Sequence, residues 1–247
     1  MQAKFIDVLH SPFVFELYQS CIKKELDLKK YNIIEAKRVL LKKDKRSLFY
    51  EDFGASNKSR ETKVSLLANE HLKPARIAQI LCRILEKYGY ANAVELGTSL
   101  GITTCYLGMG IQSGGMVYTI EASEQVRIIA NEGINGLGLV PKITSYLGTF
   151  DQVLPGVLKD IGKLDFLFID GNHSYEATLR YFEMAKPYLH NKSLLVFDDI
   201  YWSAGMTKAW EEIKVDPIVT VTVDLFFVGL VYFRREQVKE HFKLRIF

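Results

Sequence analysis

Short apolar runs alternate with amphipathic stretches from about residue 91 onward. The apolar runs predict five strands, with the sequences ANAVEL (91–96), MVYTIE (116–121), PKITSYL (141–147), DFLFID (165–170) and SLLVFD (193–198). The stretch after each run predicts a helix, beginning near Leu100, Ser123, Thr149, Tyr175 and Ala204. Strands that alternate with helices in this way are typical of βαβ units around a parallel sheet.

The last two apolar runs, PIVTVTVD (217–224) and LFFVGLVYF (225–233), follow each other directly. No crossover helix fits between them, so they predict an antiparallel pair at the edge of the sheet. The predicted fold class is therefore α/β: a doubly wound, mostly parallel, seven-stranded sheet of Rossmann-like type with an antiparallel C-terminal hairpin.

Residues 1 to about 90 differ in pattern, because they carry helical periodicity and lack strand-like runs. Ser11 and Pro12 predict a helix start, with serine as N-cap and proline at the first helical position. Residues 51–62 are polar and predict a mobile loop, whose part from Asp52 to Thr62 would close as a lid over a bound cofactor. We predict a helical N-terminal cap and substrate segment over 1–74, with this loop, and a ligand-binding domain over 75–247.

The segment from Cys21 to Arg46 has ten Lys or Arg residues against four acids. That excess could meet a phosphate-bearing partner. The more ordinary interpretation is a solvated helix face whose apolar residues turn inward. These residues are Ile22, Leu26, Ile33, Ile34, Val39 and Leu40.

Composition narrows the class of protein. With 48% hydrophobic and 25% charged residues, the 247-residue chain has the balance of a globular protein. The net charge of +3 is too small to indicate a nucleic-acid or membrane partner. Three scattered cysteines, no secretion signal and a longest apolar run near Leu225–Phe233 lead us to expect a cytoplasmic protein without a membrane span.

The loop after the first predicted strand, Gly97-Thr98-Ser99-Leu100-Gly101, lies where ligands bind in open parallel sheets. Its spacing is not the G-x-G-x-x-G of dinucleotide-binding loops. We expect Gly97 to permit a sharp turn, Ser99 to cap the next helix and Gly101 to let that helix pack on the sheet. The helix N-terminus would favour a negatively charged group.

Glu121 ends the next predicted strand, 24 residues beyond Gly97. An acid there is placed to accept hydrogen bonds from both hydroxyls of a ribose. The alternative is an acid that merely favours the dipole of the following helix. The residues alone thus indicate a ribose-containing ligand.

The stretch Glu95-Leu96-Gly97-Thr98-Ser99-Leu100-Gly101 resembles the E-x-G-x-G-x-G motif of class I S-adenosylmethionine-dependent methyltransferases, with serine for the middle glycine. Together with Glu121 and the terminal hairpin, the resemblance covers about residues 75 to 235. It implies that the loop cradles the methionine part of the cofactor, Glu121 binds the ribose, and Gly148-Thr149 lies near the adenine. The implied cofactor-binding residues are Glu95, Gly97, Thr98, Ser99, Gly101, Glu121, Ala122, Gly148, Thr149 and Asp170.

Two further stretches, LDFLFIDGNHSYEAT and KSLLVFDDIYWSAGM, resemble the O-methyltransferases of the catechol and caffeoyl-coenzyme A type. The resemblance implies a metal site made of Asp170, Asp198 and Asp199. Three oxygen ligands with open positions suit a hard cation such as Mg²⁺. The predicted activity is methylation of a hydroxyl on a small-molecule acceptor.

The same residues allow a mechanism without a metal. A hydroxyl needs a metal or a base before it attacks well, and His173 near Asp170 could be that base. The catalytic candidates are therefore Asp170 and His173. Alternatively, Asp199 caps the next helix and His173 donates to a carboxylate in a structural role.

Two other functions compete with methyl transfer. An NAD(P)-dependent oxidoreductase would explain Glu121 equally well, but neither the loop spacing nor the final hairpin. A nucleic-acid-binding protein would use the basic N-terminal segment. That segment lacks the interleaved aromatic residues that stack on bases, so nucleic acid is the less expected partner.

Overall fold

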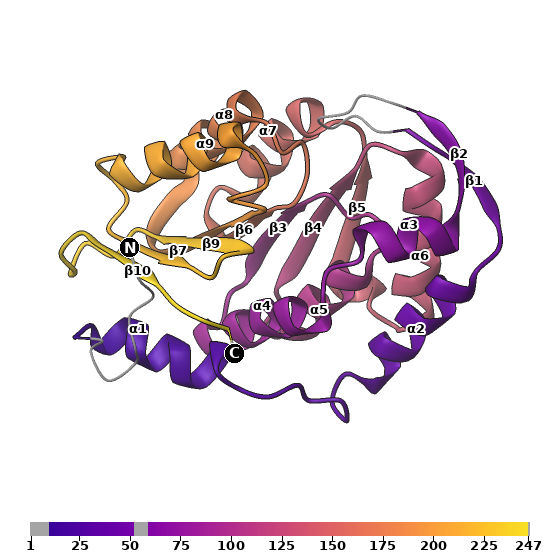
Figure 1. Ribbon diagram of the computed structural model, residues 1–247, viewed down its shortest axis with the longest axis horizontal. Helices are drawn as coiled ribbons and strands as arrows, with labels where there is room; N and C mark the ends of the chain where they lie inside the picture. The colour runs from indigo at the N-terminus through magenta and orange to yellow at the C-terminus, as the bar shows by residue number, and fades with distance from the viewer. Residues whose placement is uncertain (1–9, 52–58, 247) are drawn as a thin grey trace. The chain divides into compact units, whose positions relative to one another are not determined.

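The computed structural model describes residues 10–51 and 59–246 (Figure 1). The chain divides into two compact units. One, Glu25–Val157, is called the central unit here. The other, called the terminal unit, combines Met1–Lys24 with Leu158–Phe247.

In the central unit, strands and helices alternate as the hydrophobic pattern predicts. Strands β3 (Asn92–Leu96), β4 (Met116–Glu121) and β5 (Ile143–Leu147) pair in parallel in that order. The crossovers are α5 (Ile102–Gly110) and α6 (Glu124–Gly136), and the short helix η3 (Val140–Lys142) leads into β5. Helix α4 (Ala75–Tyr88) packs on α5. The C-terminal ends of the three parallel strands therefore lie at one edge.

In the terminal unit, β6 (Leu164–Ile169) and β7 (Leu189–Asp198) are parallel. The predicted hairpin is confirmed, because β8 (Val221–Asp224) and β9 (Val228–Tyr232) pair antiparallel and β9 also pairs antiparallel with β7. Within the described ranges, β10 (Glu240–Lys243) adds an eighth strand to the seven predicted, parallel to β8. The α/β fold class is thus confirmed.

Helices join these strands in the terminal unit. They are α8 (Tyr175–Ala185), η4 (Lys186–Tyr188) and α9 (Ala204–Val215), preceded by α7 (Phe150–Ile161), which crosses the boundary between the units. Helix α1 (Pro12–Leu17) begins as predicted, with Ser11 as its N-cap, and continues as the π-helix η2 (Tyr18–Ile22). Phe13 of α1 packs edge-on against Tyr232, with ring centroids 4.9 Å apart.

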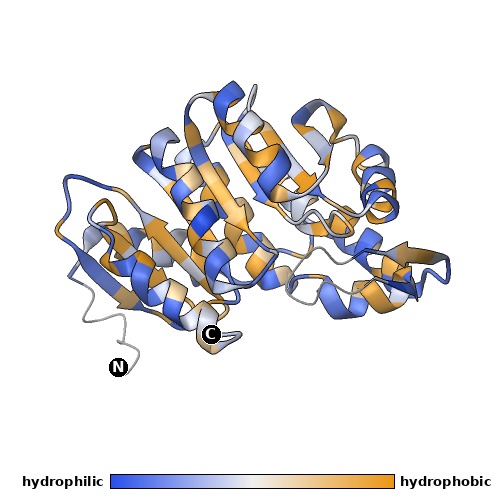
Figure 2. Ribbon diagram, turned by 90° about the horizontal axis from the view of Figure 1, so that it is seen from above, coloured by the Kyte–Doolittle hydropathy of each residue, from blue (hydrophilic) through white to orange (hydrophobic). Residues whose placement is uncertain are grey.

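The apolar residues concentrate in the strands and on the inward faces of the helices (Figure 2). Gly229, within the run LFFVGLVYF, shows how closely strand β9 packs on helix α9. A Cβ atom at this position would lie 2.6 Å from the ring of Trp210 on α9. Only glycine therefore lets β9 pass under the buried tryptophan. In the described ranges, no helix has the length and apolar character that crossing a membrane requires.

The prediction that residues 1 to about 90 lack strands is wrong. Strands β1 (Ser47–Tyr50) and β2 (Arg60–Lys63) form an antiparallel pair, with Leu48 opposite Thr62. Four-residue strands such as RETK carry too little alternation for the pattern to reveal them. β1 packs on α6, where the Phe49 amide donates to Gln125 Oε1 at 2.7 Å. Most of the loop predicted over 51–62 lies outside the described residues.

The prediction of which apolar residues face inward in the basic segment Cys21–Arg46 is also wrong in part. Ile22 and Ile34 are buried, but Leu26, Ile33, Val39 and Leu40 are 42–64% exposed. Helix α2 (Asn32–Lys43) instead buries Ile34, Arg38 and Leu41. Arg38 tolerates burial because Glu35 pairs with its Nε at 2.9 Å and the Lys73 carbonyl accepts from Nη1 at 2.7 Å. Helix α3 (Val64–His71) packs on α2.

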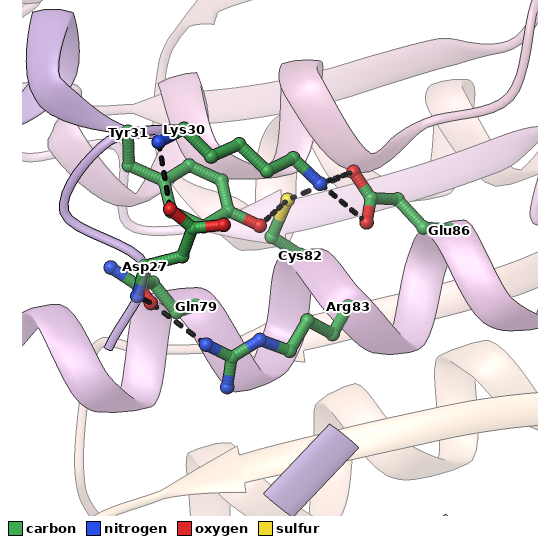
Figure 3. Close-up of polar contacts among 7 residues, drawn as sticks. All are labelled: Asp27, Lys30, Tyr31, Gln79, Cys82, Arg83 and Glu86. Atoms are coloured by element: carbon green, nitrogen blue, oxygen red, sulfur yellow. Dashed lines mark hydrogen bonds and ion pairs between the residues drawn. The ribbon is translucent and has the colours of Figure 1, made fainter. Parts of the chain in front are cut away.

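Polar contacts hold the chain before α2 on helix α4 (Figure 3). Gln79 Oε1 accepts from the Asp27 amide at 2.9 Å, and Lys30 pairs with Glu86 at 2.6 Å. The Tyr31 hydroxyl lies 3.4 Å from Cys82 Sγ. Burial raises the pKa of the Cys82 thiol to about 12, so this sulfur stays protonated and unreactive. These contacts make the segment a part of the central unit.

Candidate active site

The loop after β3 turns sharply through three residues with left-handed backbone. The φ angles are +103° at Gly97, +48° at Ser99 and +79° at Gly101. The amides of Gly97 and Thr98 both donate to the Ile120 carbonyl, at 3.1 and 3.3 Å. Ser99 therefore occupies a conformation that costs a residue with a Cβ atom about 1–2 kcal/mol. This is the position where the resembling motif has its middle glycine.

One detail of the predicted loop is wrong. Helix α5 begins at Ile102 with Gly101 as its N-cap, so Ser99 does not cap the helix. Gly101 also permits close packing of the chain against helix α6. A Cβ atom at Gly101 would lie 3.0 Å from the Ala130 Cβ.

Glu121 holds together the ends of all three parallel strands of the central unit. Its Oε2 accepts from the Ser99 amide at 2.9 Å and its Oε1 from the Ser123 amide at 3.0 Å. Its main-chain carbonyl accepts from the Gly148 amide at 3.0 Å. A carboxylate has about four acceptor sites, and loop amides occupy two of those on Glu121. The sequence suggested a ligand-binding role for Glu121 but not this second role in shaping the loops.

The remaining residues predicted to bind a cofactor take different places around these loops. Ala122 and Thr149 are half-buried beside Glu121 and Gly148, and the Thr149 amide donates to Gln152 Oε1 at 3.2 Å. Glu95 is fully buried beneath the loop. Its Oε2 accepts from the hydroxyls of Thr104 at 2.5 Å and Thr119 at 2.7 Å. Because Glu95 is fully buried, its position favours a role in supporting the loop.

A second group of predicted residues converges in the terminal unit. Asp170 and His173 follow β6, and Asp198 is the last residue of β7. One ligand atom from each of these three residues lies within 4.8 Å of the other two. His173 Nε2 is 3.8 Å from Asp170 Oδ1 and also 3.8 Å from Asp199 Oδ2. We call these four residues the acidic cluster.

The chain turns abruptly on both sides of the acidic cluster. Asn172 and Asp199 have φ angles of +48° and +52°, so each turn places a polar side chain directly after a buried strand. The Asp199 amide donates to the Phe227 carbonyl at 2.8 Å. Ser203, not Asp199, caps helix α9 through a 3.1 Å bond from the Met206 amide. The alternative role of Asp199 as a helix cap is therefore wrong.

Comparison with known proteins finds a family model that matches part of the chain. Residues 94–200 match the family model described as a methyltransferase domain. The matched range contains the glycine-rich loop, Glu121 and the whole acidic cluster. Over these residues the chain is therefore similar to methyltransferases.

The relatives that match this chain in sequence are distant. A catechol O-methyltransferase of Niastella koreensis is 25% identical over 129 residues, which is 52% of this chain and 56% of that protein. Tricin synthase 2 of Oryza sativa subsp. japonica is 24% identical over 152 residues, which is 57% of this chain and 50% of that protein. The chain thus matches about half the length of each of these relatives.

The fold is shared with solved structures. The O-methyltransferase from Bacillus cereus in complex with SAH superposes with a TM-score of 0.59 at 20% sequence identity. The match covers 92% of this chain and 100% of that one. The likeness in fold therefore extends beyond residues 94–200.

The donor set of the acidic cluster suits a divalent cation. Asp198 is only 2% exposed, and one of its oxygens lies within 4.8 Å of ligand atoms of Asp170 and His173. Like charges held this close favour a positive charge between them. Carboxylate oxygens favour Mg²⁺, Ca²⁺ or Mn²⁺, and an imidazole adds affinity for transition metals. The residues thus fit a metal, and a protonated His173 would also offset part of the charge.

Sequence reasoning missed a polar contact next to the acidic cluster. The Tyr201 hydroxyl donates to Asp224 Oδ2 of β8, and Lys243 of β10 lies 3.5 Å from the same oxygen. Burial and the bond to Asp224 raise the pKa of Tyr201. The run DDIYW pointed to the acids, but no sequence signal linked Tyr201 to strands more than 20 residues away.

Proposed function

We propose that the chain is an S-adenosylmethionine-dependent methyltransferase that methylates a hydroxyl group of a small molecule. The observation that carries the proposal is the glycine-rich loop organised by Glu121 within a methyltransferase domain. A hydroxyl acceptor is supported by the relatives, which are named catechol O-methyltransferase and tricin synthase.

The central unit would bind the methyl donor. The amides of the Gly97–Gly101 loop and the N-terminus of α5 suit the negatively charged carboxylate of the methionine part. Glu121 would accept from the ribose hydroxyls. Ala122, Gly148 and Thr149 would line the side of the adenine. Residues 1–74 would then form the cap that selects the acceptor.

The acidic cluster would prepare the acceptor. In the transfer, the bond from the methyl carbon to the sulfonium sulfur breaks, a bond to the acceptor oxygen forms, and the hydroxyl proton leaves. His173 Nε2 would receive that proton, and Asp170 at 3.8 Å would stabilise the imidazolium. When bound by Asp170, Asp198 and Asp199, a cation such as Mg²⁺ would lower the pKa of the hydroxyl.

We also propose that the protein works in the cytoplasm. All three cysteines are buried and none forms a disulfide, which suits a reducing compartment such as the cytoplasm. The partner would be a small-molecule acceptor, with no need for nucleic acid or a membrane.

Thermal unfolding with two ligands tests the proposal against its nearest competitor. S-adenosylhomocysteine should raise the midpoint of unfolding, because a ligand that binds only the folded state stabilises it. NADH should leave the midpoint unchanged. Stabilisation by NADH alone would instead identify the domain as an oxidoreductase.

A further inference from the structure

A partly buried polar network joins the C-terminal strand to the segment that carries Asp199. Lys243 of β10 stands opposite Asp224 of β8 in the parallel register. Its Nζ lies 3.5 Å from Asp224 Oδ2 and 3.3 Å from the Tyr201 hydroxyl, and 4.8 Å from the centre of the Tyr201 ring. Asp224 is 6% exposed, and Lys243 supplies a positive charge close to its buried carboxylate.

Asp224 reaches the 199–203 segment along two routes. Its Oδ2 accepts from the hydroxyl of Tyr201, two residues after Asp199. Its Oδ1 accepts from the Phe226 amide at 2.7 Å. The neighbouring carbonyl, that of Phe227, accepts from the Asp199 amide at 2.8 Å. The second route ends on Asp199, the residue that lies 3.8 Å from His173, and the first ends two residues later on Tyr201.

The backbone along the second route is strained. Phe226 has a φ angle of +73°, and Asp199 one of +52°, although neither is a glycine. A bulky residue keeps such a conformation only where its surroundings enforce it. Asp224 supplies that constraint at Phe226, because its carboxylate holds the amide of the strained residue.

We propose that Lys243 is a positioning residue, which acts through Asp224 and Tyr201 to hold the 199–203 segment, and with it Asp199, in the geometry that methyl transfer requires. The catalytic part of this inference rests on the proposed function. Its structural part, that Lys243 orders the segment, is independent of any ligand.

Hydrogen exchange followed by mass spectrometry tests the structural part. In Lys243→Met, the amides of Asp199 and Trp202 should exchange about tenfold faster, because a buried charge has lost its partner. Lys243→Arg should restore most of the protection. The matched control is Lys239→Met, since Lys239 belongs to the same C-terminal segment but donates to the carbonyls of Val215 and Asp216 at 3.1 and 2.7 Å.

Equal exchange of the 199–203 segment in Lys243→Met and Lys239→Met would overturn the inference. If Lys243→Met does not fold, Tyr201→Phe decides instead, because it removes only one hydroxyl from the network. Faster exchange at Asp199 and Trp202 in Tyr201→Phe supports the inference, and unchanged exchange there overturns it.

Steady-state kinetics test the catalytic part. Lys243→Met should lower kcat about tenfold and leave KM for S-adenosylmethionine within twofold. A merely structural lysine would leave both constants as they are in Lys239→Met. If the wild-type protein fails to bind S-adenosylhomocysteine, the proposed function is wrong, while the exchange result still decides whether Lys243 orders the segment.

Discussion

The glycine-rich loop and the acidic cluster differ in what surrounds their charged side chains. In the loop, the protein's own main chain stabilises the charged group, because Glu121 accepts from the amides of Ser99 and Ser123. In the acidic cluster, side chains from successive turns bring like charges together, with ligand atoms of Asp170, His173 and Asp198 within 4.8 Å. The loop is therefore organised before a ligand arrives, whereas the cluster is built to receive a cation or a proton.

This difference predicts different responses to substitution. Removing Glu121, which holds the loop, should weaken both folding and cofactor binding. Removing an acid from the cluster should weaken catalysis but relieve repulsion in the protein without a metal. The predictions below test that contrast, beginning with the largest effect.

Asp198→Asn should lower kcat/KM by at least about 100-fold, because it removes a buried ligand charge. The same substitution should raise the free energy of unfolding without metal, because fewer like charges remain together. Steady-state kinetics and denaturant unfolding measure the two effects. Asp160→Asn, at an exposed acid of α7, should change neither quantity. A loss of both activity and stability in Asp198→Asn would mean that the cluster is organised like the loop.

Glu121→Ala should weaken S-adenosylhomocysteine binding by roughly 1.5–3 kcal/mol, because both the ribose contact and the loop anchor disappear. It should also lower stability, unlike the substitution in the cluster. Isothermal titration calorimetry measures the affinity. Glu124→Ala is the matched control, since Glu124 is an exposed acid in the first turn of α6. Equal affinity in the two variants would restrict Glu121 to the helix-dipole role.

Mg²⁺ at ten times its Kd should stabilise the wild-type protein by about 1.4 kcal/mol. The gain should vanish in Asp198→Asn, because the cluster loses a ligand. Thermal unfolding with and without the metal measures this gain. The same stabilisation in both proteins would place the metal elsewhere and leave His173 as the base.

Gly101→Ala should cost about 1 kcal/mol of stability, because alanine at a φ of +79° is strained and crowds Ala130. Ser99→Ala should cost much less, since serine already carries a Cβ atom at its left-handed position. Chemical denaturation of both variants gives the comparison. Equal losses of stability in Gly101→Ala and Ser99→Ala would show that the need for glycine does not differ between the two positions.

Much of the fold could be predicted from the sequence because long buried strands leave strong patterns. The runs at 91–96 and 116–121 became β3 and β4 within a residue. β1, β2 and β10 were not predicted, since strands of four residues with mixed polarity resemble loops. The buried face of α2 was misplaced because Arg38 lies inside it, paired with Glu35, where the pattern suggested an exposed charge.

The candidate residues could be predicted better than their local roles. Asp170, His173 and Asp198 come together because each lies just after a strand or at its end. The second role of Glu121 could not be predicted, because it depends on loop amides that only the folded chain brings near. Likewise, the pairing of Lys243 with Asp224 depends on the register of β10 against β8.

Calorimetric titration of the wild-type protein with S-adenosylhomocysteine tests the central claim most directly. We expect one site per chain with a Kd of roughly 1–100 µM, in the range of cofactor-like substrates, and a weaker Kd in Glu121→Ala. Absence of binding to the folded wild-type protein would contradict the assignment of the Gly97–Gly101 loop as the place where the methyl donor binds.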